Sequence, residues 1–93
     1  MADPDERSGI LFGRYQAIRI HAVIARLPKA EFTTGQVAQL LDGVKSDAVS
    51  KELSKLRAVG LVRSRSRSGD YERVEETCYW EFIEELSTEW GLE

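Results

Sequence analysis

The sequence has little of what a disulfide framework, a metal cluster or a membrane span requires. Its 93 residues include one cysteine and one histidine, so neither an internal disulfide nor a zinc site of several Cys and His ligands is expected. The most apolar stretch, residues 18–27, carries Arg19, His21 and Arg26 and is too short to span a bilayer. The single Cys78 suits a reducing compartment.

The composition is that of one small globular domain. Hydrophobic residues make up 42% and charged residues 31% of the chain, which favours a folded soluble protein over a disordered one. The first residues, MADPDERSG, lack an apolar core, so we expect no signal or transit peptide and a cytoplasmic protein. We expect residues 1–9 to be flexible and residues 10–93 to form one domain.

The net charge of −3 hides a strong asymmetry along the chain. Residues 45–67 hold seven Lys and Arg against two Asp and Glu, a local balance of +5. Residues 68–93 hold one Arg against nine Asp and Glu, a balance of −8, and residues 1–44 are balanced. Because local fields attract a polyanion, the middle of the chain is the candidate for binding one.

Residues 10–27 are expected to form the first helix, which Pro28 ends. Apolar residues occupy two sides of its helical wheel, with Leu11, Tyr15, Ile18, Ala22 and Ala25 on one side and Phe12, Ile20, Val23, Ile24 and Leu27 on the other. A helix that is apolar on two sides needs two partners. We expect the second to be another copy of the chain, contacted through Tyr15, Ile20 and Ile24.

Two short helices are expected next, over residues 34–42 and 46–59. Thr33 and Gln36 have the spacing of a capping box at the start of the first helix. Ser46 is expected to cap the second, in which valine and leucine residues form one apolar stripe. Two short helices joined by a tight turn, the second amphipathic, predict a helix-turn-helix.

Residues 61–74 are expected to form a β-hairpin. Strand alternation places Arg63, Arg65 and Arg67 on one face and three serines on the other, so neither face can enter a core. Such a hairpin must project into solvent.

Two registers of this hairpin remain open. With a turn at residues 68–69, Arg65 faces Glu72 across the strands, and cross-strand pairs neutralise part of the arginine charge. With a turn at residues 69–70, Arg65 faces Val74 and more of that charge is left unpaired.

The final helix is expected over residues 78–91. Its apolar stripe consists of Tyr79, Phe82, Ile83, Leu86 and Trp90, and glutamates cover most of the rest. We expect this stripe to join the first helix in forming the dimer.

The order of these elements resembles a winged-helix DNA-binding domain. The stretch SDAVSKELSKLRAVGLVRSRSRSGDYERV, residues 46–74, is similar to the recognition helix and wing of small repressors of the ArsR and MarR type. The resemblance implies a mainly α fold with a small β-hairpin: a winged helix-turn-helix with an added C-terminal helix. Metal-sensing members carry cysteine clusters that this chain lacks, so neither metal sensing nor an effector is inferred.

In this interpretation the second helix of the pair enters the major groove of double-stranded DNA. The residues expected to contact DNA are Ser46, Asp47, Ser50, Lys51, Ser54 and Lys55 on that helix, Thr34, Gly35 and Gln36 at the preceding helix start, and Arg63, Arg65 and Arg67 on the wing. The alternatives are that Lys51 and Lys55 only cover a solvated face and pair with Glu52 or Asp47, and that the hairpin neutralises its own charge.

The sequence therefore predicts a homodimeric transcriptional regulator that binds a roughly palindromic DNA site. One rival is a protein-docking winged helix that uses the acidic last helix with Trp80 and Trp90 to bind a basic partner. Another is a phage or plasmid accessory protein with the same DNA-binding chemistry. No catalytic constellation and no cofactor or metal site is expected; His21 reads as a packing or surface residue and Cys78 as a half-buried inert thiol.

Overall fold

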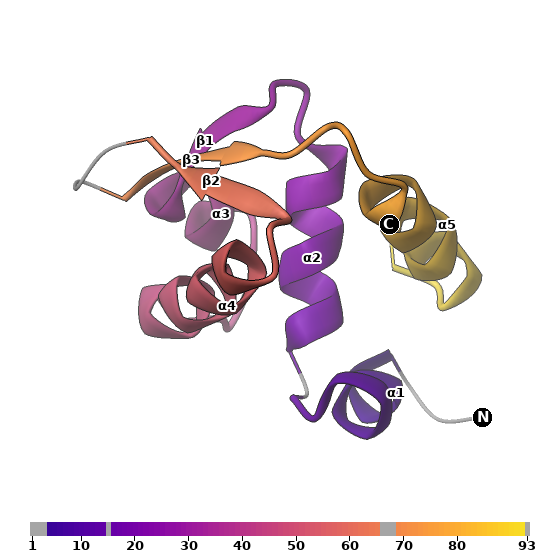
Figure 1. Cartoon of the computed structure of the whole chain (residues 1–93). Helices are drawn as coiled ribbons and strands as arrows, with labels where there is room; N and C mark the ends of the chain where they lie inside the picture. The colour runs from indigo at the N-terminus through magenta and orange to yellow at the C-terminus, as the bar shows by residue number, and fades with distance from the viewer. Residues whose placement is uncertain (1–3, 15, 66–68, 93) are drawn as a thin grey trace.

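A computed structural model describes residues 4–14, 16–65 and 69–92. This part of the chain is a mainly helical small domain with a three-stranded antiparallel sheet (Figure 1), as expected at that level of detail. Its elements are α1 (Pro4–Phe12), α2 (Ala17–Arg26), β1 (Glu31–Thr33), α3 (Thr34–Gln39), α4 (Ser46–Ala58), β2 (Val62–Ser64), β3 (Asp70–Arg73) and α5 (Tyr79–Glu89). None of these helices is long and apolar enough to cross a membrane.

Helix α2 stands at the centre of the molecule and fills its two apolar sides within its own chain. The helix pair α3–α4 and the sheet lie on one side of it, and α5 packs along the other (Figure 1). Ile20 and Ile24 are 2% and 0% exposed and belong to the same core as Ile83 of α5. The expectation that the first helix needs a second copy of the chain to cover these residues is therefore wrong.

The N-terminal region differs from the sequence-based expectation. Residues 4–9, expected to be flexible, belong to helix α1, and the helix expected over residues 10–27 begins at Ala17. The chain breaks between the two helices at Gly13, whose φ of +77° is a conformation that only glycine adopts without strain. The Ser8 hydroxyl holds the break together, since it donates to the Arg14 carbonyl at 2.5 Å and accepts from the Ile18 N–H at 3.1 Å.

The capping box at the start of α3 is confirmed. The Thr33 hydroxyl accepts from the Gln36 N–H at 3.1 Å, and the Gln36 side-chain oxygen accepts from the Thr33 N–H at 2.9 Å. Helix α3 ends at Gln39, earlier than the expected residue 42. The expected Ser46 cap is wrong, because Lys45 occupies the N-cap of α4 without a side-chain hydrogen bond.

The sheet contains one strand more than expected. Strand β1 pairs with β3, which also pairs with β2, so the order is β1-β3-β2. Phe32 of β1 and Tyr71 of β3 stack at 6.1 Å between ring centroids on the inner face of the sheet, where Val62 is buried.

The register of the hairpin is neither of the two expected. Arg63 lies opposite Glu72, and the Arg65 N–H donates to the Asp70 carbonyl at 2.8 Å. Arg67 lies outside the described residues.

Hydrogen bonds from three side chains, those of Arg73, Trp80 and Arg26, connect α2, α5 and the region of the sheet. The Arg73 guanidinium donates to the carbonyls of Ile24, Ala25 and Leu27 and so satisfies the carbonyl end of α2. The Trp80 indole N–H donates to the Leu61 carbonyl at 3.3 Å, and Arg26 donates to the Ser87 hydroxyl at 2.7 Å. These bonds fix α5, which covers residues 79–89 of the expected 78–91, against α2 and the sheet.

Candidate nucleic-acid interface

Helix α4 buries one stripe and exposes the opposite face. Val49, Leu53 and Leu56 are buried in the core, as the 3.6-residue period predicts. The six residues of α4 expected to contact DNA are all exposed: Ser46, Asp47, Ser50, Lys51, Ser54 and Lys55. The sequence therefore identified the exposed face of this helix correctly.

The cations of that face are available. Lys51, Lys55 and the exposed Arg57 form no ion pair with any described residue. Glu52, one of the expected partners of the lysines, turns into the core instead. The outer surface of α4 thus presents amine and guanidinium groups to solvent, with only Asp47 as an exposed acidic neighbour on the helix.

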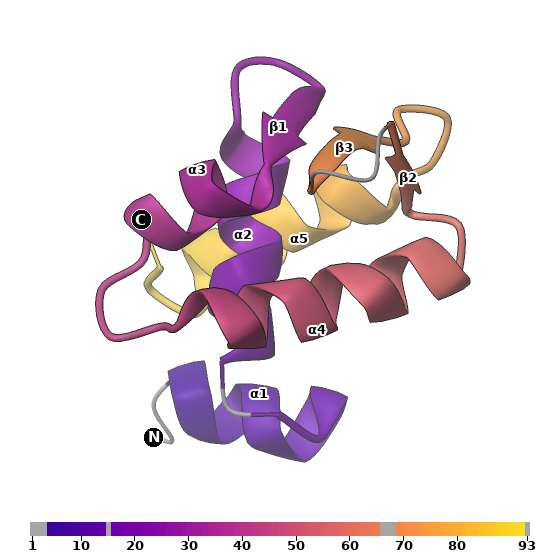
Figure 2. The same cartoon turned by 90° about the vertical axis from the view of Figure 1, so that its left-hand side faces the viewer.

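Helices α4 and α5 lie on opposite sides of the molecule. Figure 2 shows α4 in front, with α3 and the hairpin above it, and α5 behind α2. The exposed residues of α5 include Glu81, Glu84, Glu85 and Glu89. The strongly acidic end of the chain therefore points away from the cationic helix.

The wing arginines are occupied by carboxylates. Arg63 lies 3.5 Å from Glu72 and 3.2 Å from Glu76, measured between guanidinium nitrogen and carboxylate oxygen. Arg65 forms an ion pair with Glu31 of β1. Only the Arg63–Glu72 pair lies within the hairpin, because Glu31 and Glu76 come from outside residues 61–74. The described wing arginines are therefore paired mainly with carboxylates from other parts of the chain.

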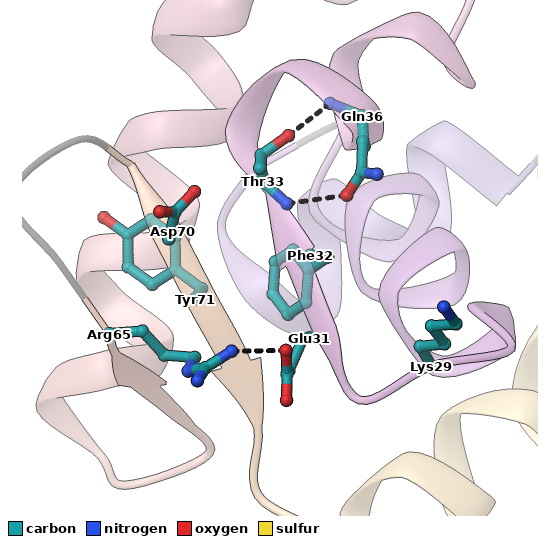
Figure 3. Close-up of a pocket in the computed structure, with 8 residues that line it drawn as sticks. All are labelled: Lys29, Glu31, Phe32, Thr33, Gln36, Arg65, Asp70 and Tyr71. Atoms are coloured by element: carbon teal, nitrogen blue, oxygen red, sulfur yellow. Dashed lines mark hydrogen bonds and ion pairs between the residues drawn. The ribbon is translucent and has the colours of Figure 1, made fainter.

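A shallow hollow of about 460 Å³ opens beside the ion pair of Arg65 and Glu31. It is lined by Lys29, Glu31, Phe32, Thr33, Gln36, Arg65, Asp70 and Tyr71. Figure 3 shows the Arg65–Glu31 pair crossing from the hairpin to β1, with the capping box of α3 and Lys29 on the far side. The hollow joins the hairpin to the start of the helix-turn-helix.

The start of α3 is not a phosphate-binding site of the kind expected. The Thr34 N–H donates to the Gly69 carbonyl at 3.2 Å, and the Gln36 N–H donates to Thr33. The expected phosphate donors are the N–H groups of Thr34, Gly35 and Gln36. Those of Thr34 and Gln36 are therefore already used within the protein. Instead, the Thr34 bond ties the hairpin to the helix pair.

A buried polar cluster behind α4 was missed by the sequence analysis. Arg14 donates to both oxygens of Glu52 at 2.7 Å, as a bidentate pair. His21 Nε2 lies 2.8 Å from the same carboxylate, and His21 Nδ1 lies 2.6 Å from the Tyr79 hydroxyl. The cluster connects the α1–α2 junction, α2, α4 and α5, so His21 is a packing residue with a polar role.

The protonation states in this cluster follow from its hydrogen bonds. Burial opposes ionisation of Glu52, but hydrogen bonds from His21 and Arg14 outweigh it and lower the pKa of that carboxyl to about 2. Burial and the Glu52 charge raise the pKa of Tyr79 to about 12. When His21 is neutral, its Nε2–H donates to the carboxylate and its Nδ1 accepts from the Tyr79 hydroxyl.

Most of the residues expected at a dimer interface have other roles. Ile20, Ile24 and Ile83 are buried in the core and cannot reach a second copy. Tyr79 is half-buried against His21.

The rest of the expected interface is divided. Leu86 and Trp90 are half-buried. The guanidinium carbon of Arg7 lies over the Trp90 ring, 5.6 Å from the ring centroid. Phe82 is exposed, and Tyr15 lies outside the described residues. Other large apolar side chains are more exposed than Phe82: Val59, Leu40, and the adjacent Ile10 and Leu11 of α1, which are 83% and 60% exposed.

No metal centre is found in the part of the chain that the structure describes, where no three His, Cys, Asp or Glu side chains come together. Cys78 is exposed rather than half-buried. Comparisons with known proteins found no matching family model, no similar curated protein and no similar solved structure.

Proposed function

We propose that this protein is a winged-helix, double-stranded DNA-binding protein that regulates transcription, with α4 as its recognition helix. The observation that carries the proposal is the exposed face of α4, where Lys51, Lys55 and Arg57 have no acidic partner among the described residues. The order α2, β1, α3, α4, β2, β3, with the hairpin tied to the start of α3, supports it.

Polar and cationic side chains of α4 would have different roles in binding DNA. The residues in the first half of α4, Ser46, Asp47 and Ser50, would reach base edges in the major groove. The cations of α4 would contact phosphates, which fix position but read no sequence. The hairpin would approach the neighbouring backbone or minor groove with Arg63 and Arg65.

A homodimer remains part of the proposal, with a revised surface. Because Ile20, Ile24 and Ile83 are buried, the exposed Ile10 and Leu11 of α1 are the better candidates for contact between two copies. A selection of bound fragments from random duplex DNA would report two half-sites about one helical turn apart if two recognition helices bind together. A single half-site would count against the dimer.

The proposal is tested by charge reversal on α4. We expect wild-type protein to bind the selected duplex with an affinity that falls steeply as salt rises, because phosphate contacts release counterions. Lys51→Glu with Lys55→Glu should lower the affinity at least 100-fold, roughly the loss expected when two phosphate contacts become repulsive. Fluorescence anisotropy with a labelled duplex at two salt concentrations measures both.

The matched control reverses two charges on the opposite side of the molecule. Glu84→Lys with Glu85→Lys should leave DNA affinity within a few-fold of the wild-type value, since α5 points away from α4. No binding to any duplex at low salt, or equal effects of the two double variants, would argue against the proposal.

The docking alternative retains one supporting observation. Phe82 is 48% exposed on α5 among the exposed glutamates, a combination that suits a basic, partly apolar partner. Trp80 is buried and Trp90 half-buried, so neither is the anchor that the sequence suggested. In this alternative the Glu84 and Glu85 reversals abolish docking and the lysine reversals do not. A phage or plasmid accessory role would share the DNA chemistry, and in either case we place the protein in the cytoplasm.

A further inference from the structure

On the outer face of the sheet, glutamate side chains form ion pairs with Arg63 and Arg65. Arg63, Glu72 and Glu31 stand in one row across the three strands, because residues opposite one another share a face. Arg65 forms an ion pair with Glu31 on the same face. Glu76, which follows β3 in the chain, forms an ion pair with Arg63.

The local charge balance of the hairpin therefore differs from that of α4. In the described part of the outer sheet face, two arginines meet three carboxylates in ion pairs. On α4, three exposed cations face one exposed acid, Asp47. Among the described residues of this face the two arginines are outnumbered by three carboxylates, so the positive field of the described residues is centred on α4.

The pairs are placed where phosphate can displace them. Arg63 and Arg65 keep 55% and 48% of their side chains exposed, and the hollow beside Arg65 leaves room on one side of its pair. Exposed ion pairs change an equilibrium by no more than about fivefold each, so a phosphate held at the right place can take the guanidinium over. Release requires side-chain rotation only, because both arginines lie on the solvent face of the sheet.

We propose that Glu31, Glu72 and Glu76 form an autoinhibitory contact that holds Arg63 and Arg65 away from phosphates until α4 is seated in its groove. On unrelated DNA the carboxylates compete with phosphate and keep binding weak. On a matching site α4 fixes the backbone within reach of the hairpin, and the arginines exchange partners. This inference rests on the proposed DNA-binding function and gives an inhibitory role to three acidic residues beside the proposed DNA-binding surface.

The test neutralises the three carboxylates without changing their shape. For the triple variant Glu31→Gln, Glu72→Gln, Glu76→Gln we expect affinity for the selected duplex to rise about tenfold, because binding no longer breaks the ion pairs of the arginines. Affinity for an unrelated 20-base-pair duplex should rise by no more than that, because its phosphates are not fixed within reach of the hairpin.

The control removes the same charge elsewhere. Glu84→Gln, Glu85→Gln, Glu89→Gln on α5 changes the net charge equally, and we expect it to raise affinity for either duplex less than threefold, since long-range effects are screened. Adding Arg63→Ala and Arg65→Ala to the wing triple variant should remove its gain. Thermal unfolding of each variant verifies that the fold is retained.

The outcomes separate the two proposals. A wild-type protein that binds no duplex removes the proposed function and this inference together. Wild-type binding that is sensitive to the α4 lysines, combined with an unchanged affinity of the wing triple variant for the selected duplex, overturns this inference alone. Equal gains in the wing and α5 triple variants also overturn it, because net charge would then explain the effect.

Discussion

Glu52 is the residue at which a sequence-based interpretation of α4 fails most clearly. A carboxylate between two lysine-bearing turns looks like a surface charge, yet Glu52 is 3% exposed. Burying an ion without partners is costly, and Arg14 and His21 offset that cost with hydrogen bonds. A signal was present in the sequence, because Glu52 lies next to Leu56 on the helical wheel, at the edge of the apolar stripe of α4. Its partners could not be found, since they come from sites more than 30 residues away.

The pKa of Glu52 predicts a loss of stability in acid. Its folded-state pKa of about 2 lies below the ordinary value of 4.5, so its contribution is present above pH 4.5 and is lost as the pH falls toward 2. Between pH 5 and pH 3 we expect wild-type protein to lose about 2 kcal/mol more of its free energy of unfolding than Glu52→Gln does. Urea denaturation at the two pH values measures this difference.

The exposed Glu85→Gln variant serves as the control. Its loss between pH 5 and pH 3 should match that of the wild-type protein, because Glu85 is exposed on α5. Equal losses in wild-type protein and Glu52→Gln would mean that the buried cluster does not hold Glu52 ionised.

At the scale of the elements, features that depend on residues close in the sequence were predicted correctly. Features that depend on pairing between distant segments were not. The α4 stripe and the capping box depend on residues three or four apart, and both were predicted. The hairpin register was not, since it is fixed by contacts outside the hairpin: the Thr34 N–H on the Gly69 carbonyl and the β1–β3 ladder. Strand β1 has three residues, too few for a period to show. The break at Gly13 interrupts an apolar pattern that continues through it.

The two helix starts give a prediction that separates a real cap from an expected one. Thr33→Ala should lower the free energy of unfolding by about 1 kcal/mol, because the Gln36 N–H loses its acceptor. Ser46→Ala should change it by less than about 0.5 kcal/mol, because Lys45 and not Ser46 is the N-cap of α4. Thermal or urea unfolding compares them, and a larger effect at Ser46 would contradict the assignment of the α4 start.

The whole molecule separates its charges in space as the sequence separates them along the chain. The core around α2 holds α4 and the acidic α5 on opposite sides, so a net charge of −3 is compatible with a cationic face (Figure 1). The position of the chain's positive segment was predictable from composition. The pairing of Arg63 and Arg65 with carboxylates was not, because Glu31 and Glu76 reach them through the folded sheet.

The central claim is that duplex DNA binds the face made by α4 and the hairpin. Titration of isotopically labelled protein with the selected duplex, followed by the shifts of the backbone amide resonances, tests it most directly. The account predicts that the largest changes fall on residues 46–58, with further changes on residues 62–65 and 70–73, and that residues 79–89 change little. Changes centred on residues 79–89, or none at low salt, would contradict it.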